Sequence, residues 1–418
     1  MKITNCRIAG EEKLQDILIR DGKFAKIGPA LPDAAGETID AGGKLAVPPF
    51  VEPHIHLDAT LTAGDPAWND SGTLFEGIQL WARRKETLTV DDVVTRAVET
   101  VETCARHGIQ FIRTHVDVTD PALTALEAML VVRERVKDLC EMQIVAFPQD
   151  GILSFPDGEG LMRRAADMGA DVLGAIPHGE FMRDQGVESV RFVMDLAERR
   201  GLRVDIHCDE IDDEQSRFLE VVAAEAIRIG NGARVTASHT CAMGSYNDAY
   251  AYKLMGTLRK SAINFVSCPT ESIHLQGRLD TYPKRRGLTR VKELLAAGLN
   301  VCFAQDSIID PWYPLGNGNI LNVLFHGLHI AQLTGRGEID RSLDLITVNG
   351  ARTMGVSERY GIEAGKPASL VILDAESAYD AVRTQCVVLH SIRNGRVIAN
   401  AVPARKTLVG RTDAHAGK

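Results

Sequence analysis

The chain has 418 residues, of which 45% are hydrophobic and 25% are charged, and its formal net charge is −9 at pH 7. This length and composition predict a globular protein with a large buried core, and the negative charge argues against nucleic-acid backbones and anionic membranes as partners. The start has no apolar signal-peptide region, no segment is long enough to span a bilayer, and the eight cysteines form no C-x-x-C pair. We therefore expect a cytoplasmic protein with reduced thiols.

The first predicted elements are short β-like pieces between turn signals such as Asp21-Gly22 and Gly42-Gly43. These pieces are Lys2–Ile8, Asp16–Arg20 and Lys23–Ile27. Eight apolar, β-rich runs follow: Leu45–Val51, Ile109–Val116, Met142–Phe147, Val172–Ile176, Leu202–Ile206, Arg234–Ser238, Ile263–Cys268 and Asn300–Phe303. Helical patterns between them include Val90–His107, Gly186–Arg200 and Asp213–Ile229. This alternation predicts the α/β class, with a (β/α)8 TIM-like barrel over residues 48–355.

β-rich sequence returns after residue 355, in Ala368–Leu373, Cys386–Leu389 and Arg396–Ala399. We expect these runs to join the first strands in one small β domain built from both chain ends, residues 1–47 and 356–418. The chain shows no internal repeat and no low-complexity segment.

Potential metal ligands follow several of the predicted barrel strands: His54, His56, His207, His239 and Asp306. The carboxyl ends of barrel strands meet at one rim, so these side chains can converge. Alone, His54-Ile-His56 would also fit half-exposed polar residues, but on an extended strand both imidazoles project to one side and can chelate one ion. Imidazole plus one carboxylate suits Zn(II) or Fe(II) better than calcium or magnesium. We expect one ion, because strand four contains no lysine that could bridge a second.

These motifs resemble the amidohydrolase superfamily, as does the segment Ile362–Leu373. Within that superfamily the chain is similar to free-base cytosine deaminases over nearly its whole length. The most distinctive segments are Pro48–Leu57, Ser71–Gly77, His207–Arg217, Ile273–Arg278 and Asp310–Leu315.

The resemblance implies that His54, His56, His207 and Asp306 hold the metal, which lowers the pKa of a bound water toward ~7. Asp306 would also take the proton of that water, and His239 would orient the attacking oxygen. Glu210 would be the proton shuttle, first to the ring nitrogen and then to the departing ammonia. A hydrolase of ordinary amides needs no ring protonation, so Glu210 favours deamination.

The predicted substrate contacts begin with Gln149, at the end of strand three. Its carboxamide offers one donor and one acceptor, which match the O2 and N1–H edge of a free pyrimidine. The resemblance implies that the Leu74 backbone and the Phe147 and Trp312 rings frame the base, although core packing would also explain the two rings. His115, Asp58, His178 and His274 are candidates for contacts behind the ligands, and the sequence does not choose among them.

The chain departs from the cytosine-deaminase pattern directly after Asp306. Ser307 stands where those enzymes have a second aspartate, Gln305 replaces a histidine, and Cys268 and Thr270-Glu271 differ in a neighbouring loop. Neutral change or a helix-capping serine would explain Ser307. A sharper explanation is space for a 5-methyl group: burying that methyl contributes only ~0.8 kcal/mol, whereas desolvating a carboxylate against it costs more.

We therefore predict hydrolysis of 5-methylcytosine to thymine and ammonia. The Ser307 departure is similar to that seen in 5-methylcytosine deaminases. Conversion of cytosine to uracil, or of another aminated base such as isoguanine, is the alternative with the same mechanism. An amide-cleaving amidohydrolase fits less well because of Glu210, and a non-catalytic barrel scaffold fits less well because the ligand set is complete. The expected partners are a small free pyrimidine base and further copies of the chain in a homo-oligomer.

Overall fold

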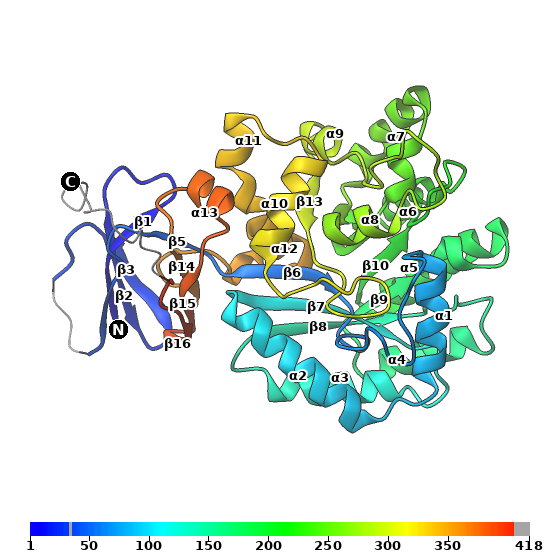
Figure 1. The fold of residues 1–418 in the computed structure, drawn as a ribbon, viewed down its shortest axis with the longest axis horizontal. Helices are drawn as coiled ribbons and strands as arrows, with labels where there is room; N and C mark the ends of the chain where they lie inside the picture. Colours follow the sequence, from blue (N-terminus) through cyan, green and yellow to red (C-terminus); the bar gives the residue numbers. More distant parts are fainter. Residues whose placement is uncertain (33–35, 405–418) are drawn as a thin grey trace, which may run out of the picture.

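Two separate sheets organise the computed structural model, which describes residues 1–32 and 36–404 (Figure 1). The larger sheet has eight parallel strands in sequential order: β6 (Phe50–Ile55), β7 (Ile109–Asp117), β8 (Glu141–Phe147), β9 (Val172–Ala175), β10 (Arg203–Cys208), β11 (Val235–His239), β12 (Asn264–Ser267) and β13 (Asn300–Phe303). A bridge between Ile55 and Asp306 joins its two edges, so the barrel is nearly closed. The predicted α/β barrel is thus confirmed.

Helices surround the barrel in Figure 1. They are α1 (Leu74–Lys85), α2 (Val90–Arg106), α3 (Thr124–Arg135), α4 (Gly158–Met168), α5 (Arg183–Arg200), α6 (Phe218–Ile229), α7 (Asp248–Ser261), α8 (Pro269–Leu275), α9 (Val291–Ala296), α10 (Ile320–Ile330), α11 (Arg336–Asp340), α12 (Val348–Met354) and α13 (Ala378–Thr384). Short 3₁₀ turns are η1 (Pro177–Gly179), η2 (Gly232–Arg234), η3 (Cys241–Ser245), η4 (Ser342–Ile346) and η5 (Ser357–Arg359).

The second sheet is built from both ends of the chain, as predicted. Its strands are β1 (Lys2–Ile8), β2 (Gln15–Arg20), β3 (Lys23–Gly28), β4 (Thr38–Asp40), β5 (Leu45–Val47), β14 (Leu370–Leu373), β15 (Val388–Arg393) and β16 (Arg396–Asn400). The two ends meet where β5 pairs with β1 on one side and with β14 on the other. The expected second segment of this domain, 356–418, extends into residues 405–418, which lie outside the described residues.

The run Leu45–Val51, expected as one barrel strand, is divided between the two sheets. β5 belongs to the small sheet, and β6 begins the barrel at Phe50, whose N–H donates to the Gly108 carbonyl at 3.0 Å. Pro48 and Pro49 separate the two strands, and neither can donate a hydrogen bond to a sheet. The proline pair therefore marks the passage from one sheet to the other.

Helix α6 begins five residues later than the predicted start at Asp213, at Phe218. The cause is Asp209, whose carboxylate accepts hydrogen bonds from the backbone N–H groups of Phe218 and Leu219 at 3.0 and 2.8 Å. This remote side chain satisfies the free donors at the helix start, the task that a capping residue normally performs. The segment before it forms the loop that follows strand β10 and leads away from the barrel rim.

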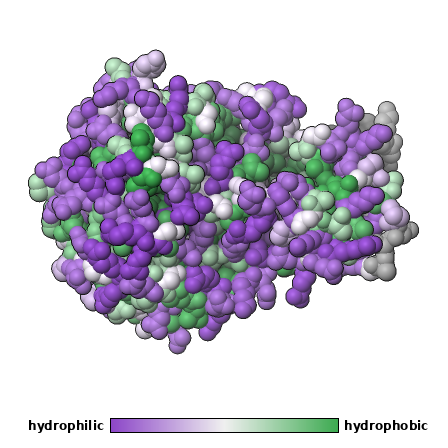
Figure 2. Space-filling model, turned by 180° about the vertical axis from the view of Figure 1, so that it is seen from behind, coloured by the Kyte–Doolittle hydropathy of each residue, from purple (hydrophilic) through white to green (hydrophobic). Residues whose placement is uncertain are grey.

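Apolar side chains fill the space between barrel and helices. Helix α2 is typical: Thr89 caps its start by accepting from the Asp92 N–H at 3.2 Å, and Val93, Ala97 and Val101 face the core. In contrast, hydrophilic residues cover most of the face seen in Figure 2. The eight cysteines are all free and buried. Among the described residues, no helix is long and apolar enough to cross a membrane.

Candidate metal centre and active-site pocket

The predicted ligands lie together at the carboxyl ends of the barrel strands, because each strand delivers its side chain to the same rim. His54 is in β6, His207 in β10 and His239 at the end of β11, while Asp306 follows β13. His239 and Asp306 have φ angles of 66° and 69°, in the left-handed region that non-glycine residues rarely adopt. Such backbone strain concentrates at functional sites.

Backbone hydrogen bonds hold Asp306 in this conformation. Its N–H donates to the His54 carbonyl at 3.0 Å, and its carbonyl accepts from the His56 N–H at 2.9 Å. The same two contacts close the barrel, so the ligand from the last strand is placed directly against the ligands from the first.

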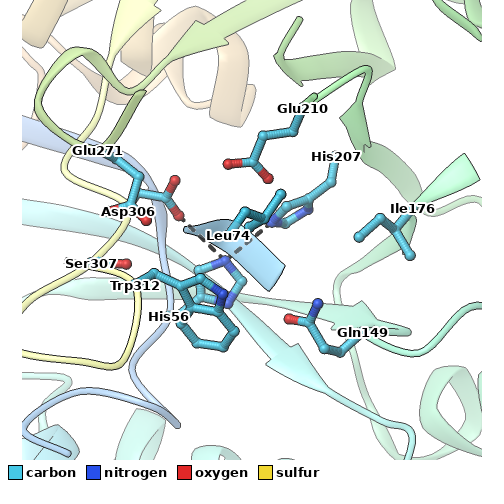
Figure 3. Close-up of a pocket in the computed structure, with 10 residues that line it drawn as sticks. All are labelled: His56, Leu74, Gln149, Ile176, His207, Glu210, Glu271, Asp306, Ser307 and Trp312. Carbon is cyan, nitrogen blue, oxygen red and sulfur yellow. Dashed lines mark hydrogen bonds and ion pairs between the residues drawn. The ribbon is translucent and has the colours of Figure 1, made fainter. Parts of the chain in front are cut away.

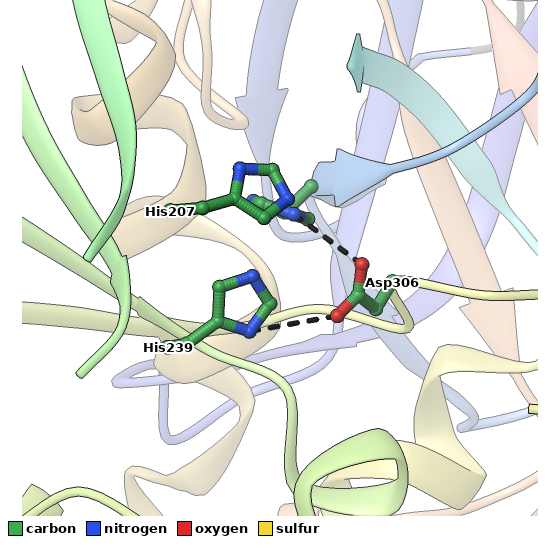
Figure 4. A group of neighbouring side chains, drawn as sticks. His207, His239 and Asp306 are labelled. Carbon is green, nitrogen blue, oxygen red and sulfur yellow. Dashed lines mark ion pairs between the residues drawn. The ribbon is translucent and has the colours of Figure 1, made fainter. Parts of the chain in front are cut away.

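The ligand atoms lie close to one another. The Nε2 atoms of His54 and His56 are each 3.3 Å from Asp306 Oδ1, and His56 Nε2 is 3.1 Å from His207 Nε2. His239 Nδ1 is 3.5 Å from Asp306 Oδ2 (Figure 4). One tight group, with donor atoms within 4.8 Å of each other, consists of His54, His207, His239 and Asp306. His56 adjoins that group through its contacts with His207 and Asp306.

The donor set fits a divalent ion. In the part of the chain that the structure describes, the buried Nε2 atoms of His54 and His239 have no hydrogen-bond partner. Burial lowers the pKa of His54 to about 4 and that of His239 to about 3, so both imidazoles are neutral, the form that ligates metals. Separations of 3.1 to 3.3 Å between the donor atoms match the ~3 to 3.5 Å expected for ligands of one tetrahedral ion.

A hydrogen-bonded chain behind His54 fixes its ring. Its Nδ1 is 3.0 Å from Ser238 Oγ, which donates to Asp205 at 2.6 Å, and Asp205 in turn accepts from Arg113 at 2.9 Å. His115 stacks on the other side of the ring, with centroids 3.8 Å apart. Contacts of this kind orient a metal ligand and set its tautomer.

The other candidates for supporting contacts differ in position. Asp58 is buried and accepts a backbone N–H from the end of β7 at 2.8 Å. The ring nitrogens of His178 are buried and make no hydrogen bond within the described residues. His274 is half-buried and bonded to Arg278. Of the four, His115 alone stacks on a candidate ligand.

A pocket with about 330 Å³ of empty space opens beside the centre (Figure 3). It is lined by His56, Leu74, Gln149, Ile176, His207, Glu210, Glu271, Asp306, Ser307 and Trp312. The structure thus brings four of the five expected substrate contacts to the pocket wall. The fifth, Phe147, is not among the lining residues: it stacks on His207 at 3.9 Å, which supports the imidazole from behind.

Trp312 is held from two sides. Asp310 accepts from the Trp312 and Tyr313 N–H groups at 2.9 and 3.0 Å, which shapes the loop after β13. The indole packs against Gly77 of α1, where an added Cβ would lie only 2.5 Å from Trp312 Cδ1. A larger residue at position 77 would therefore displace this ring, which lines the pocket.

Glu210 lies at the pocket beside the histidine cluster, with Oε1 3.5 Å from His239 Nδ1. Burial, reinforced by the charge of Asp306, raises the pKa of Glu210 well above its usual range. A carboxyl group in this state carries a proton that it can donate.

The sequence assigned no site role to three residues, although Glu271 was among the departures from the cytosine-deaminase pattern. Glu271 and Ile176 line the pocket, and Glu52 in β6 is fully buried and accepts from the backbone N–H and the side-chain amide of Gln305. This contact explains the unusual Gln305, which faces Glu52. Each missed residue lies in or just after a barrel strand, and that position was the available signal.

Comparisons with known proteins agree with this architecture. The model of the Amidohydrolase family matches residues 37–399. N-isopropylammelide isopropyl amidohydrolase of Pseudomonas sp. (strain ADP) is 30% identical, with 95% of this chain and 96% of the relative covered. The crystal structure of 5-methylcytosine deaminase from Klebsiella pneumoniae, liganded with 5-fluorocytosine, is 58% identical, with a TM-score of 0.96 over 98% of this chain and 99% of that one. N-isopropylammelide isopropylaminohydrolase from Burkholderia multivorans is 27% identical, with a TM-score of 0.82 over 96% and 98%.

Proposed function

The chain belongs to the Amidohydrolase family, and from this premise we propose that it is a metal-dependent hydrolase that deaminates free 5-methylcytosine to thymine and ammonia. The strongest support is the likeness, at 58% identity over nearly the whole chain, to a 5-methylcytosine deaminase. The site supports the same reaction class, because a buried proton donor and a cluster of neutral imidazoles border one small pocket.

Ser307 supports the methylated base in particular. It directly follows Asp306, lines the pocket and is only 2% exposed, so its side chain forms part of the wall that a bound base would touch. Serine leaves more room than the aspartate of the cytosine-deaminase pattern and carries no charge that a methyl group would desolvate.

We infer that His54, His56, His207 and Asp306 hold one divalent ion, Zn(II) or Fe(II). Such an ion supplies Lewis-acid chemistry and lowers the pKa of a water molecule bound to it toward ~7. The liganding role of each residue remains a prediction, as do the cytoplasmic location and the homo-oligomer.

The remaining steps belong to the chain's own groups. Asp306 accepts the proton of the attacking water, and His239 donates a hydrogen bond that orients the oxygen toward C4. Glu210 protonates N3 as the C4–O bond forms, and the carboxylate left behind takes the proton of the new C4 hydroxyl and passes it to the amino group. The amino group leaves as ammonia when the C4–N bond breaks and the C4 carbonyl forms, and the proton held by Asp306 returns to Glu210. Gln149 reads the O2 and N1–H edge, which a nucleoside cannot present because its sugar replaces that hydrogen.

Ammonia release from a panel of free bases, with iron- and zinc-loaded enzyme, tests the proposal. We expect 5-methylcytosine to have the highest kcat/KM, cytosine a lower value, and cytidine none above background. A preference for cytosine or isoguanine would assign the alternative substrate. Activity on amides without base turnover, or no turnover at all, would contradict deamination.

A further inference from the structure

Glu271 is a buried acid that the steps above do not use. It lies in the first turn of α8, just beyond the carboxyl end of β12, and is 2% exposed. It lines the pocket, and its Oε2 has no hydrogen-bond partner among the described residues. Figure 3 shows Glu271 on the same side of the pocket as Ser307 and Asp306, across from Gln149.

The surroundings of this carboxyl supply no cation. Apart from burial, the largest electrostatic influences on it are the carboxylates of Asp306, Asp310 and Glu210, and the Ser307 hydroxyl is a favourable side-chain contact. A buried polar oxygen without a partner is destabilising, and buried polar groups in native proteins nearly always have a partner. A molecule in the pocket can supply the missing partner, and a hydrogen-bond donor would satisfy this oxygen.

The proposed orientation of the base identifies that donor. Gln149 reads the N1–H and O2 edge, and Glu210 serves N3, so the 4-amino group and C5 face the opposite wall, which contains Ser307 and Glu271. The 4-amino group has two N–H donors, whereas the 5-methyl group has none. A carboxyl oxygen accepts a hydrogen bond in either protonation state.

We propose that Glu271 is a substrate-binding residue that accepts a hydrogen bond from the 4-amino group of the base. This inference rests on the proposed function and adds to it a means of distinguishing substrate from product. Thymine carries an oxygen at C4 in place of the amino group, so the N–H that Glu271 accepts is lost on deamination.

Kinetics of Glu271→Met, which keeps the length of the side chain but removes the acceptor, tests this proposal. We expect kcat/KM for 5-methylcytosine to fall at least about tenfold, mainly through KM, as befits the loss of one buried hydrogen bond. The Ki of thymine as a competitive inhibitor should change by less than about twofold, because thymine never used the contact. Glu271→Gln keeps an acceptor oxygen and should restore KM to within about threefold.

Thr270→Val is the matched control, since Thr270 is buried in the same turn but does not line the pocket. The KM for 5-methylcytosine and the Ki of thymine should both stay at their wild-type values. Equal weakening of substrate and thymine in Glu271→Met would show a merely structural role and overturn the inference while the proposed function stands. Wild-type enzyme that deaminates no cytosine-type base would overturn both.

Discussion

Glu210 combines two properties that a proton shuttle needs. It lies 3.5 Å from His239, next to the position where the reacting carbon would lie, and burial raises its pKa, which favours the protonated form that can donate. Glu210→Gln retains the size and hydrogen-bonding reach of the side chain but cannot transfer a proton. We expect unchanged metal content and melting temperature, with kcat reduced about 10²- to 10⁴-fold. Turnover above about a tenth of wild type, a barrier change below ~1.4 kcal/mol, would contradict the shuttle role.

Ser307 tests the specificity for the methylated base. A carboxylate at this position would lie in a wall that already contains Glu271 and would face the 5-substituent, where its desolvation is unfavourable by several kcal/mol. We therefore expect Ser307→Asp to lower kcat/KM for 5-methylcytosine at least about tenfold more than for cytosine. Ser307→Asn introduces a side chain with the shape of aspartate but no charge, and it therefore separates the effect of bulk from that of charge. Its loss of kcat/KM for 5-methylcytosine should lie between that of the wild type and that of Ser307→Asp. Equal losses for both bases would favour the plain cytosine deaminase.

At the scale of elements, the sequence predicted what local patterns determine. Apolar runs located seven of the eight barrel strands and only the start of β6, and the polar residues after them predicted the rim where the candidate ligands lie together. What it missed depends on contacts between distant residues. The start of α6 is set by Asp209, and Phe147 is drawn behind His207 by ring stacking. The pocket position of Glu271 follows from how α8 packs over the rim, which no local pattern encodes.

The contact of α1 with the loop after β13 gives a prediction at this scale. Alanine is a better helix former than glycine, by ~1 kcal/mol, so Gly77→Ala would ordinarily stabilise α1. Its Cβ, however, would lie 2.5 Å from Trp312 Cδ1, so the indole, which lines the pocket, must shift. We expect KM to rise at least about fivefold and tryptophan fluorescence to change, while the helix content stays the same.

Gly256→Ala in α7 is the matched control, because nothing lies within 4 Å of the added Cβ. It should stabilise the protein slightly and leave KM unchanged. If Gly77→Ala behaved in the same way as this control, the close packing of Trp312 on α1 would not govern the pocket.

At the scale of the whole molecule, the sheet from the chain ends lies against the amino-terminal ends of the barrel strands, the side opposite the pocket. Gln110, near the start of β7, connects the two units: its Nε2 donates to Ser391 Oγ and to the Ile392 carbonyl, both at 3.0 Å, and all three residues are fully buried. The carbonyl of Gln110 also accepts from Arg393 at 3.2 Å. We therefore expect the contacts of Gln110 with the small sheet to contribute to stability but not to catalysis, since they lie far from the pocket.

Gln110→Ala should separate these two properties. Truncation removes two hydrogen bonds to the small sheet, so we expect the free energy of unfolding to fall by about 1–3 kcal/mol in denaturant titrations. Because the pocket lies at the other end of β7, kcat and KM below the unfolding transition should stay within about twofold of wild type. Gln215→Ala, on an exposed loop residue, controls for the loss of a glutamine and should change stability by less than about 0.5 kcal/mol. Unchanged stability of Gln110→Ala would mean that the small sheet packs on the barrel without help from Gln110. A loss of activity in the folded variant would mean that the two ends of the barrel are coupled.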